Sequence, residues 1–352
     1  MRFGQVVIGG AGSGKSTYCL GISDLLTQLK RKPCLVNLDC GNGTPPYKAD
    51  IDIRDLINLE DIAEEYKLGP NGALLFSLEQ LLVDFSWLQD KIVKAGKDRY
   101  FIFDFPGQIE LFTHSNLVMD LVFKMHKELD VQLVALNLVD CLLCIDKFSY
   151  VSAALGSLSS AIRLELPFLN VLTKIDLMRT FKSDLAVSLR SALTTCGEGA
   201  LGSLADTLFP NHAVPSLKHP LDKKFHVMSR AICDLIDEYG LTGFQPLAVE
   251  DKQLMLRILV TCDKCNGYSG NRKDAMTLAE ELSTEPLEEW FGGLEERYLG
   301  DNADACASCG AAEASMRCGR CRKIKYCDQH CQSDHWKRGH RFECRAEETP
   351  KP

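Results

Sequence analysis

Short apolar runs alternate with amphipathic stretches along the first two-thirds of the chain. Runs rich in Val, Ile, Leu and Phe are typical of buried strands, and they predict strands over residues 5–8, 34–38, 100–103, 131–139, 168–172 and 244–247. Between them, apolar residues recur at helical spacing, as over residues 75–92 and 254–262. Strands separated by helices indicate an α/β fold, in which a mostly parallel sheet is covered by helices on both faces. Such sheets bind ligands at the carboxyl ends of their strands, so functional residues are expected in the loops that follow.

The first of these loops, Gly9 to Thr17, reads GGAGSGKST and fits the P-loop pattern GxxxxGK[ST] directly after Val6-Val7-Ile8. Its glycines let backbone N–H groups turn toward a polyphosphate, and a helix that opens at Lys15 adds its positive end. The nucleotide-binding residues predicted here are Gly10, Gly12, Ser13, Gly14, Lys15, Ser16 and Thr17. We expect Lys15 to reach the β- and γ-phosphates and Ser16 to hold Mg²⁺. A purely structural glycine turn is the alternative, but strand, spacing, lysine and hydroxyl all agree with a P-loop.

Two carboxylates follow the next two strands. Asp39 can face Mg²⁺ or its water shell, although an Asp in this position is also a common turn residue. Asp104 opens the run DFPGQIE, in which Gly107 would bring a backbone N–H to the γ-phosphate. Gln108 and Glu110 then stand where a side chain can orient the attacking water, so we predict a catalytic role for Asp39, Gln108 and Glu110. A plain Pro-Gly turn is the alternative for this segment.

The run Thr173-Lys174-Ile175-Asp176 follows the fifth predicted strand and is a variant of the NKxD element that binds guanine. Asp176 would accept hydrogen bonds from N1–H and the exocyclic N2–H₂, which adenine cannot supply. Lys174 would lie along the plane of the base. The order of TKID after DFPGQ therefore predicts GTP and GDP as the nucleotides.

The run Gly69-Pro70-Asn71 lies between the P-loop and the DxPG element, and with them it resembles the GPN-loop GTPases over residues 1 to about 300. Runs such as FGQVVIG, SGKSTYCLG and FDFPGQIEL are most similar to the second eukaryotic paralogue. Without its neighbours, GPNG would be interpreted as an ordinary turn. Two departures from the family are the sequence Asp39-Cys40-Gly41, where Asp-Pro-Ala is usual, and residues 183–223, which match poorly.

The resemblance implies a GTPase that works as a homodimer or as a heterodimer with another GPN-loop GTPase. In this family Asn71 would cross the dimer interface toward the phosphate region of the opposite subunit, which adds it to the predicted catalytic residues. The family is tied to assembly and nuclear import of RNA polymerase II. The resemblance therefore implies polymerase subunits or assembly factors as partners, and a cytoplasmic protein that can shuttle to the nucleus.

Composition agrees with a globular chain: 45% of its 352 residues are hydrophobic and 25% are charged. No signal peptide fits ahead of a P-loop at residue 9, and the most apolar run, residues 131–145, is too short to span a bilayer, so no membrane partner is expected. The 16 cysteines then indicate metal rather than disulfides. The pairs Cys141/Cys144 and Cys262/Cys265 have metal-like spacing, but we interpret them as packing residues because they lie on a buried strand end and an apolar helix face.

The C-terminal part changes character twice. Residues 274–304 carry ten acidic residues against one basic and predict an amphipathic connector. Residues 306–344 then supply four ligand pairs, which predict two tetrahedral Zn²⁺ sites from the ligands Cys306, Cys309, Cys318, Cys321, Cys327, Cys331, His340 and Cys344. Residues 306–352 hold 10 Lys+Arg against 6 Asp+Glu. Ordinary solvated charges explain this better than a nucleic-acid site.

The ligand pattern, with Tyr326, Gln332 and Trp336 around the last ligands, resembles a MYND zinc finger. The resemblance implies interleaved sites, the first formed by Cys306, Cys309, Cys327 and Cys331 and the second by Cys318, Cys321, His340 and Cys344. It also implies a protein-interaction module that takes short, proline-containing peptides. Because each site has four protein ligands, neither keeps a position open for catalysis.

These features predict three parts: a GTPase domain over residues 1–270, a connector over 271–305 and a zinc finger over 306–344. We expect a Mg²⁺-dependent, GTP-hydrolysing switch protein with an adaptor at its C-terminus. One alternative is a scaffold that binds nucleotide without useful turnover and acts through the finger. Another is an ATPase of the same fold. The intact lysine, hydroxyl and Gln108 favour turnover, and TKID favours GTP.

Overall fold

The structure, a computed structural model, describes residues 1–144, 147–180, 208–209, 220–239, 243–268, 298, 306, 314–321, 324–336, 341 and 344. The chain divides into two compact units, Met1–Thr173 with Ser188–Ser283 and Lys174–Val187 with Thr284–Pro352. The predicted domain boundaries at 270 and 305 and most of the poorly matching segment 183–223 lie outside the described residues. Those boundaries stay predictions.

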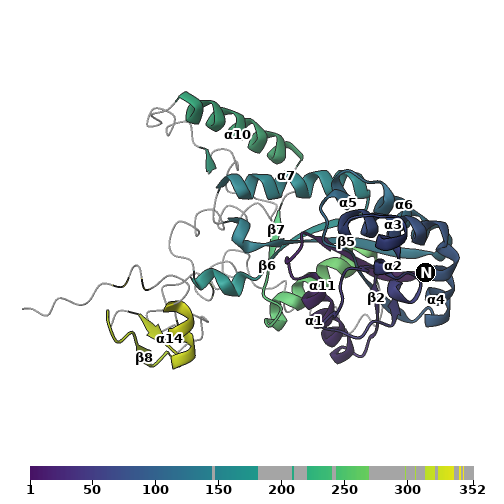
Figure 1. Cartoon of the computed structure of the whole chain (residues 1–352), viewed down its shortest axis with the longest axis horizontal. Helices are drawn as coiled ribbons and strands as arrows, with labels where there is room; N and C mark the ends of the chain where they lie inside the picture. Colours follow the sequence, from purple (N-terminus) through teal and green to yellow (C-terminus); the bar gives the residue numbers. More distant parts are fainter. Residues whose placement is uncertain are drawn as a thin grey trace, which may run out of the picture. The chain divides into compact units, whose positions relative to one another are not determined.

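A seven-stranded parallel sheet forms the centre of the first unit, with strand order β3-β2-β4-β1-β5-β6-β7 (Figure 1). Its strands are β1 (Arg2–Gly9), β2 (Lys32–Asn37), β3 (Ile51–Asp52), β4 (Arg99–Asp104), β5 (Val131–Asp140), β6 (Phe168–Thr173) and β7 (Phe244–Leu247). All six predicted strands are present, and the predicted α/β fold is confirmed. The sequence did not reveal β3, because two residues are too few to show a pattern. The register pairs Val7 with Asp104 and Gly9 with Leu138, so the carboxyl ends of the central strands meet at one edge.

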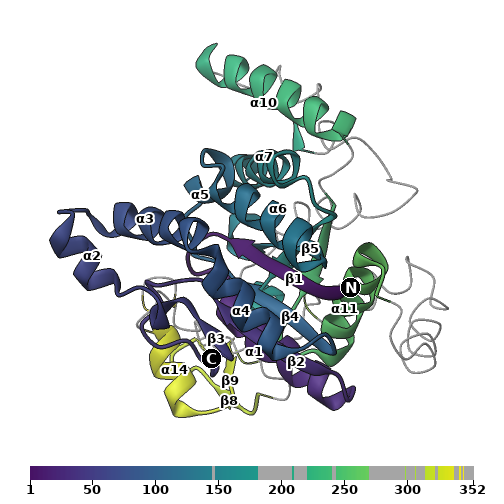
Figure 2. The ribbon, with the colours of Figure 1, turned by 90° about the vertical axis from the view of Figure 1, so that its right-hand side faces the viewer.

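Helices cover both faces of this sheet (Figure 2). One face packs against α1 (Lys15–Gln28) and α11 (Lys252–Asn266), and the other packs against α6 (Leu117–Leu129) and α7 (Lys147–Leu164). The remaining elements of this unit are α2 (Leu59–Glu65), α3 (Pro70–Val83), α4 (Phe85–Ala95), α5 (Glu110–Thr113), α10 (Pro220–Tyr239) and the 3-10 turns η1 (Ile53–Asp55) and η2 (Cys141–Cys144). Among the described residues, no helix has the length and apolar character that a membrane span needs.

The apolar run over residues 75–92 forms two helices, α3 and α4, instead of one. Asp84 separates them with φ −95° and ψ 40°, a conformation outside the α region. The apolar spacing carries across the break, because both helices bury their leucines and phenylalanines in the same core, which includes Leu78, Leu81, Phe85 and Leu88. The predicted helix over 254–262 lies within α11, where Asp251 caps the first turn by accepting hydrogen bonds from Gln253 N and Leu254 N.

Three of the four cysteines interpreted as packing residues are buried: Cys141, Cys144 and Cys262. Cys265 is exposed, so that interpretation was wrong for this residue. The helix face explains the difference, because the buried face of α11 continues from Cys262 to Asn266, and Cys265 lies off that face.

The described part of the second unit includes η3 (Ile175–Thr180) and a small ββα arrangement. Strand β8 (Met316–Arg317) pairs antiparallel with β9 (Lys325–Tyr326), and α14 (Gln329–His335) follows. Its buried cluster consists of Tyr326, Ala314 and four cysteines, Cys306, Cys318, Cys321 and Cys344. So small an apolar core cannot stabilise a fold by itself, which agrees with a module held by metal.

The buried aromatic ring of Phe103 in β4 gives a test of the sheet core. We expect Phe103→Ala to lower the free energy of unfolding by about 3–5 kcal/mol, because it removes a fully buried ring and leaves a cavity. Phe123→Ala removes the same atoms from a side chain that is 61% exposed and should cost about 0.5 kcal/mol or less. Urea unfolding measures both, and equal losses would contradict this assignment of the core.

Candidate functional site

Three glycines of the P-loop adopt backbone conformations that other residues rarely take. Gly9, Gly12 and Gly14 have φ values of 139°, 78° and 90°. At Gly9 a Cβ would also lie 2.2 Å from the carbonyl oxygen of Leu138 in the neighbouring strand. Glycine is therefore required at the turn from β1 into α1, and the loop has the conformation of a backbone cradle for phosphate.

Lys15, the first residue of α1, is nearly buried under this loop. Its Nζ donates hydrogen bonds to the carbonyl oxygens of Gly9 and Gly10, both at 3.0 Å. Burial lowers the pKa of the lysine, and the nearby carboxylates of Asp104 and Asp39 oppose that shift. The ammonium group is thus held at the mouth of the cradle, where a phosphate would supply stronger acceptors than the two carbonyls.

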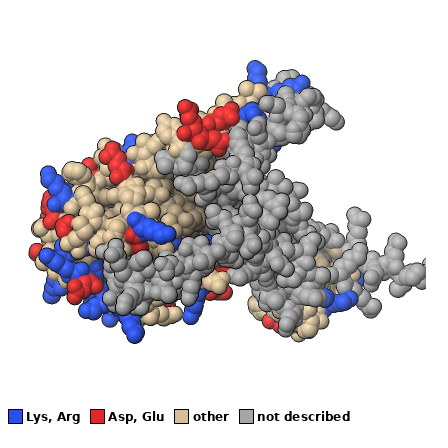
Figure 3. Space-filling view, turned by 180° about the vertical axis from the view of Figure 1, so that it is seen from behind, with Lys and Arg blue, Asp and Glu red and all other residues tan. Residues whose placement is uncertain are grey.

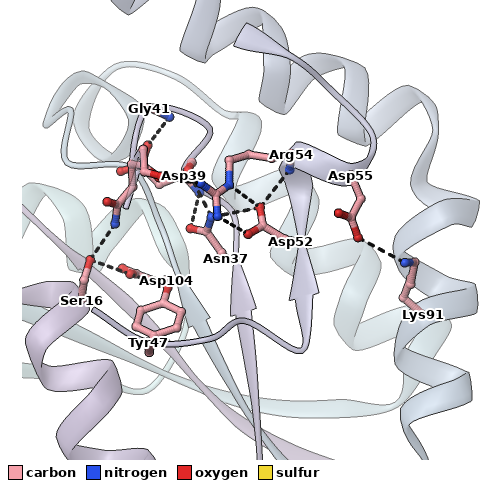
Figure 4. A network of polar contacts seen from close by, with 12 residues as sticks. Ser16, Asn37, Asp39, Gly41, Tyr47, Asp52, Arg54, Asp55, Lys91 and Asp104 are labelled. Carbon is pink, nitrogen blue, oxygen red and sulfur yellow. Dashed lines mark hydrogen bonds and ion pairs between the residues drawn. The ribbon is translucent and has the colours of Figure 1, made fainter. Parts of the chain in front are cut away.

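Ser16 and Asp104 meet at the ends of α1 and β4 (Figure 4). The Ser16 hydroxyl donates to Oδ2 of Asp104 at 2.9 Å, and the Tyr47 hydroxyl donates to the same oxygen at 2.8 Å. Asn42 donates to Ser16 Oγ at 3.1 Å. Tyr47 and Asn42 were not predicted from the sequence, because a single polar residue in a loop follows no spacing rule that would single it out.

Asp39 follows β2 and is held by its own loop. Its Oδ1 accepts a hydrogen bond from the backbone N–H of Gly41 at 2.9 Å, while its backbone N–H donates to Asn37 Oδ1 at 3.2 Å. Asn37 in turn donates to Asp52, which pairs with Arg54 at 2.6 Å. The departure from Asp-Pro-Ala to Asp-Cys-Gly therefore keeps a fixed carboxylate at this position.

The residues present fit a divalent cation. Burial raises the pKa of the Asp104 carboxyl and that of Asp39, and the hydrogen bonds they accept, the charge of Lys15 and, at Asp39, the charge of Arg54 oppose these shifts only in part. Oδ1 of Asp104 is buried and accepts no hydrogen bond. Two carboxylates and one ammonium group leave this site short of positive charge, and a hard cation with its water shell would correct that deficit. Ser16, Asp39 and Asp104 are the residues that would hold it.

The DxPG segment lies directly over the P-loop. A Cβ on Gly107 would come 2.9 Å from the Lys15 ammonium nitrogen and 2.9 Å from Ala11 Cα, so only glycine fits at this approach. Oε1 of Gln108 is buried without a hydrogen-bond partner, and it is therefore available to orient a ligand. Glu110 is exposed at the start of α5. Gln108 thus has a buried acceptor atom beside the P-loop, whereas the side chain of Glu110 is exposed to solvent.

The TKID run begins where β6 ends. The Thr173 hydroxyl donates to the carbonyl oxygen of Ser13 at 2.8 Å, which ties this strand end to the P-loop. Ser13 Oγ is buried and has no hydrogen-bond partner, and Thr17 is exposed. Lys174 has φ 61°, and Asp176 follows in η3 with an exposed side chain. Lys174 and Asp176 belong to the second unit, and their role toward the base stays a prediction.

Gly69, Pro70 and Asn71 begin helix α3. Gly69 is the N-cap, and Pro70 occupies the first helical position, where its missing N–H costs nothing. Asn71 is exposed. A Cβ on Gly41 would lie 3.4 Å from Leu74 in the first turns of α3, so this helix packs on the loop that carries Asp39.

Six of the eight predicted zinc ligands are described, and they form two groups. The sulfur atoms of Cys306, Cys327 and Cys331 lie within 4.8 Å of one another, as do those of Cys318, Cys321 and Cys344. These are the two interleaved sets that the MYND resemblance implies. Cys309 and His340, their fourth members, lie outside the described residues.

Distances within these groups fit tetrahedral zinc. Sulfurs bound at ~2.3 Å in a tetrahedron lie about 3.8 Å apart, and the Cys318 and Cys344 sulfurs are 3.8 Å apart. The Cys327 and Cys331 sulfurs are 3.4 Å apart, close to that value. The side chain of Asp328 accepts a hydrogen bond from the backbone N–H of Cys331 at 2.7 Å and so holds the first turn of α14.

Comparisons with known proteins agree with both parts of this structure. A family model described as "Conserved hypothetical ATP binding protein" matches residues 7–268, and one described as "MYND finger" matches residues 306–344. The GTPase in apo form from Pyrococcus abyssi, a crystal structure, is 22% identical, covers 75% of this chain and 97% of its own, and has a TM-score of 0.59. It therefore shares the fold.

Curated relatives are similar over most of their length. GPN-loop GTPase QQT1 of Arabidopsis thaliana is 36% identical over 305 residues, which cover 86% of this chain and 98% of that protein. GPN-loop GTPase 2 of Danio rerio is 39% identical over 300 residues, which cover 85% of each. Because identity at this level extends over nearly the whole length of a relative, this chain belongs to the family of GPN-loop GTPases.

Proposed function

We propose that this chain binds GTP with Mg²⁺ and hydrolyses it to GDP. One observation carries the proposal. At the glycine loop, Lys15 donates to the loop carbonyls and Ser16 donates to Asp104, whose other carboxylate oxygen is buried without a partner. Mg²⁺, when bound, would supply charge neutralisation on the phosphate oxygens. Membership of the GPN-loop GTPases and the fold shared with a GTPase support the same reaction.

The chain's own residues have separable tasks in this reaction. Lys15 binds phosphate oxygens, and Gly107, which lies against Ala11 of the P-loop, would bring its backbone N–H to the γ-phosphate. Gln108, whose Oε1 lacks a partner, orients the attacking water by accepting a hydrogen bond from it, with Asp39 or Glu110 as auxiliary acceptors. Asp176 reads the base from the loop after β6, beside Lys174.

A dimer, homomeric or with another GPN-loop GTPase, completes the proposal. Asn71 is exposed at the start of α3, as a residue that reaches into another subunit must be. The family resemblance supports a role in assembly or nuclear import of RNA polymerase II, and hence a cytoplasmic protein that shuttles to the nucleus. On the described part of one face, Lys and Arg are interspersed with Asp and Glu, a surface more suited to proteins than to nucleic acid (Figure 3).

The C-terminal module, in this proposal, binds two Zn²⁺ ions and takes a proline-containing peptide. Two separate cysteine triads support the count, each with a fourth ligand predicted from the sequence. Four protein ligands per ion close both coordination shells, so the module acts by binding and not by catalysis.

ATP is the second candidate nucleotide, because the matching family model is described as ATP-binding. If Asp176 reads guanine, GTP should bind ~10⁴-fold more tightly than ATP, since a carboxylate left without its donors is strongly disfavoured in a polar pocket. Asp176→Asn should shift the preference toward xanthosine nucleotides. Calorimetric titration with GTP, ATP and XTP measures this, and equal affinities for ATP and GTP would refute the guanine assignment.

Catalysis should depend on Gln108 and Asn71. We expect Gln108→Ala and Asn71→Ala each to reduce GTP turnover by ~10²-fold while GTP affinity stays nearly unchanged, because both side chains would act in the transition state. Phosphate release under saturating GTP measures turnover, with Gln89→Ala on α4 as the control for loss of an amide elsewhere.

The part of this prediction that concerns the dimer has its own test. Turnover per subunit should rise with protein concentration across the monomer–dimer transition measured by analytical ultracentrifugation. A turnover that stays constant through that transition would show that Asn71 does not act across subunits.

The finger should depend on zinc and be separable from hydrolysis. Apparent binding energies of structural zinc sites are on the order of 10 to 16 kcal/mol, so a chelator or Cys318→Ser should unfold the module while GTP hydrolysis persists. Metal analysis should give two zinc ions per chain and essentially none for a truncation ending at Asn302. Cys265→Ser, which changes an exposed cysteine outside both triads, is the matched control.

The same truncation tests the partners. Affinity capture with the full chain and with the truncated chain, each under GTP and GDP, compares the recovery of RNA polymerase II subunits. Loss of hydrolysis by a truncated protein that is still folded by circular dichroism would mean that the finger belongs to the catalytic machinery, against the proposal of two modules.

A further inference from the structure

Tyr47 lies in the loop between β2 and β3, the loop that carries Asp39. Neither the P-loop pattern nor the DxPG element includes a tyrosine at this place. Even so, the side chain is turned inward: the residue is only 6% exposed, and its hydroxyl donates to Asp104 at 2.8 Å (Figure 4). A buried hydroxyl that donates to a buried carboxylate in the candidate metal site restrains the rotation of that carboxylate.

The two oxygens of Asp104 are used differently. Oδ2 accepts hydrogen bonds from both Tyr47 and Ser16, whereas Oδ1 is buried and accepts none. Rotation of a carboxylate about its Cβ–Cγ bond is broad and nearly two-fold, so one donor on one oxygen restrains it weakly. Two donors from different elements, the β2–β3 loop and α1, fix which oxygen accepts hydrogen bonds from the protein and which accepts none.

We propose that Tyr47 is a positioning residue for the Mg²⁺ site, which holds the carboxylate of Asp104 so that Oδ1 stays available to the ion or its water shell. Its hydroxyl also ties the loop that carries Asp39 to the end of β4. The inference rests on the Mg²⁺-dependent nucleotide binding proposed above and adds a residue that neither motif contains.

Tyr47→Phe removes the hydroxyl and keeps the ring. The measurement is the release rate of a fluorescent GDP analogue from the full chain over a range of Mg²⁺ concentrations. We expect the Mg²⁺ concentration for half-maximal retention to rise about 10-fold, the change that accompanies loss of one hydrogen bond to a charged group. Release in EDTA should match that of the wild type, because the effect requires the ion.

Tyr18→Phe is the matched control. Tyr18 is a fully buried tyrosine of α1, and its hydroxyl donates to Gln5 Oε1 at 2.9 Å, a contact that involves none of the candidate Mg²⁺ residues. Both variants lose one buried hydrogen bond, so both should melt at a lower temperature. Only Tyr47→Phe should change the Mg²⁺ dependence. A shift of the same size in Tyr18→Phe would reduce Tyr47 to a packing residue and overturn the proposal.

A double-mutant cycle tests whether Tyr47 acts through Asp104. In an Asp104→Asn background, Tyr47→Phe should have no further effect on Mg²⁺ dependence, and an undiminished effect would contradict the proposal. If Tyr47→Phe melts near the assay temperature, the increase in melting temperature that Mg²⁺ gives to the GDP complex replaces the kinetic measurement. That increase should be smaller than in the wild type.

The outcomes separate the two levels of inference. A wild-type chain whose GDP release is unaffected by Mg²⁺ would refute the proposed function. A Mg²⁺-sensitive wild type with a Tyr47→Phe variant of the same sensitivity would refute only the role of Tyr47.

Discussion

The buried carboxylate of Asp104 is the constraint on which the candidate site depends. It ends β4 at 1% exposure, and the parallel register brings it opposite Val7, just before the P-loop. A buried negative charge is stable only with partners, and its partners come from separate parts of the chain: Ser16 from α1, Tyr47 from the β2–β3 loop and the charge of Lys15. The β2–β3 loop and the start of α1 are therefore fixed around one side chain.

Hydrogen bonds are unevenly distributed among the polar atoms of this site. Each hydroxyl that reaches Asp104 satisfies Oδ2, while Oδ1, Ser13 Oγ and Gln108 Oε1 stay buried without partners. Orphaned polar atoms are costly in a folded protein and are few in native structures. These three atoms belong to the P-loop and to the DxPG segment beside it, where a bound ligand would supply the missing hydrogen bonds.

The described part of the second unit lacks an apolar core large enough to stabilise it. Its described core has one fully buried aromatic side chain, Tyr326, among cysteines, and this is too little apolar area to offset the entropy of ordering the chain. Two groups of thiols drawn from distant positions would replace the core by coordination bonds. With zinc bound, interleaving would link the segment around Cys306 to α14 and the segment around Cys318 to Cys344.

Six strands of the sheet, the P-loop, the DxPG element and the ligand pairs could be predicted from the sequence alone, because each depends on local spacing of residue types. Strand runs, glycines at positive φ and CxxC pairs are written in consecutive residues. Other features depend on tertiary contacts and do not follow from local spacing. They are the break at Asp84, the short strand β3, the exposure of Cys265, and the contacts of Tyr47 and Asn42 with Asp104 and Ser16. The contacts of Tyr47 and Asn42 depend on which loops the parallel register brings to one edge, and they join residues that are 57 and 26 positions apart in the chain.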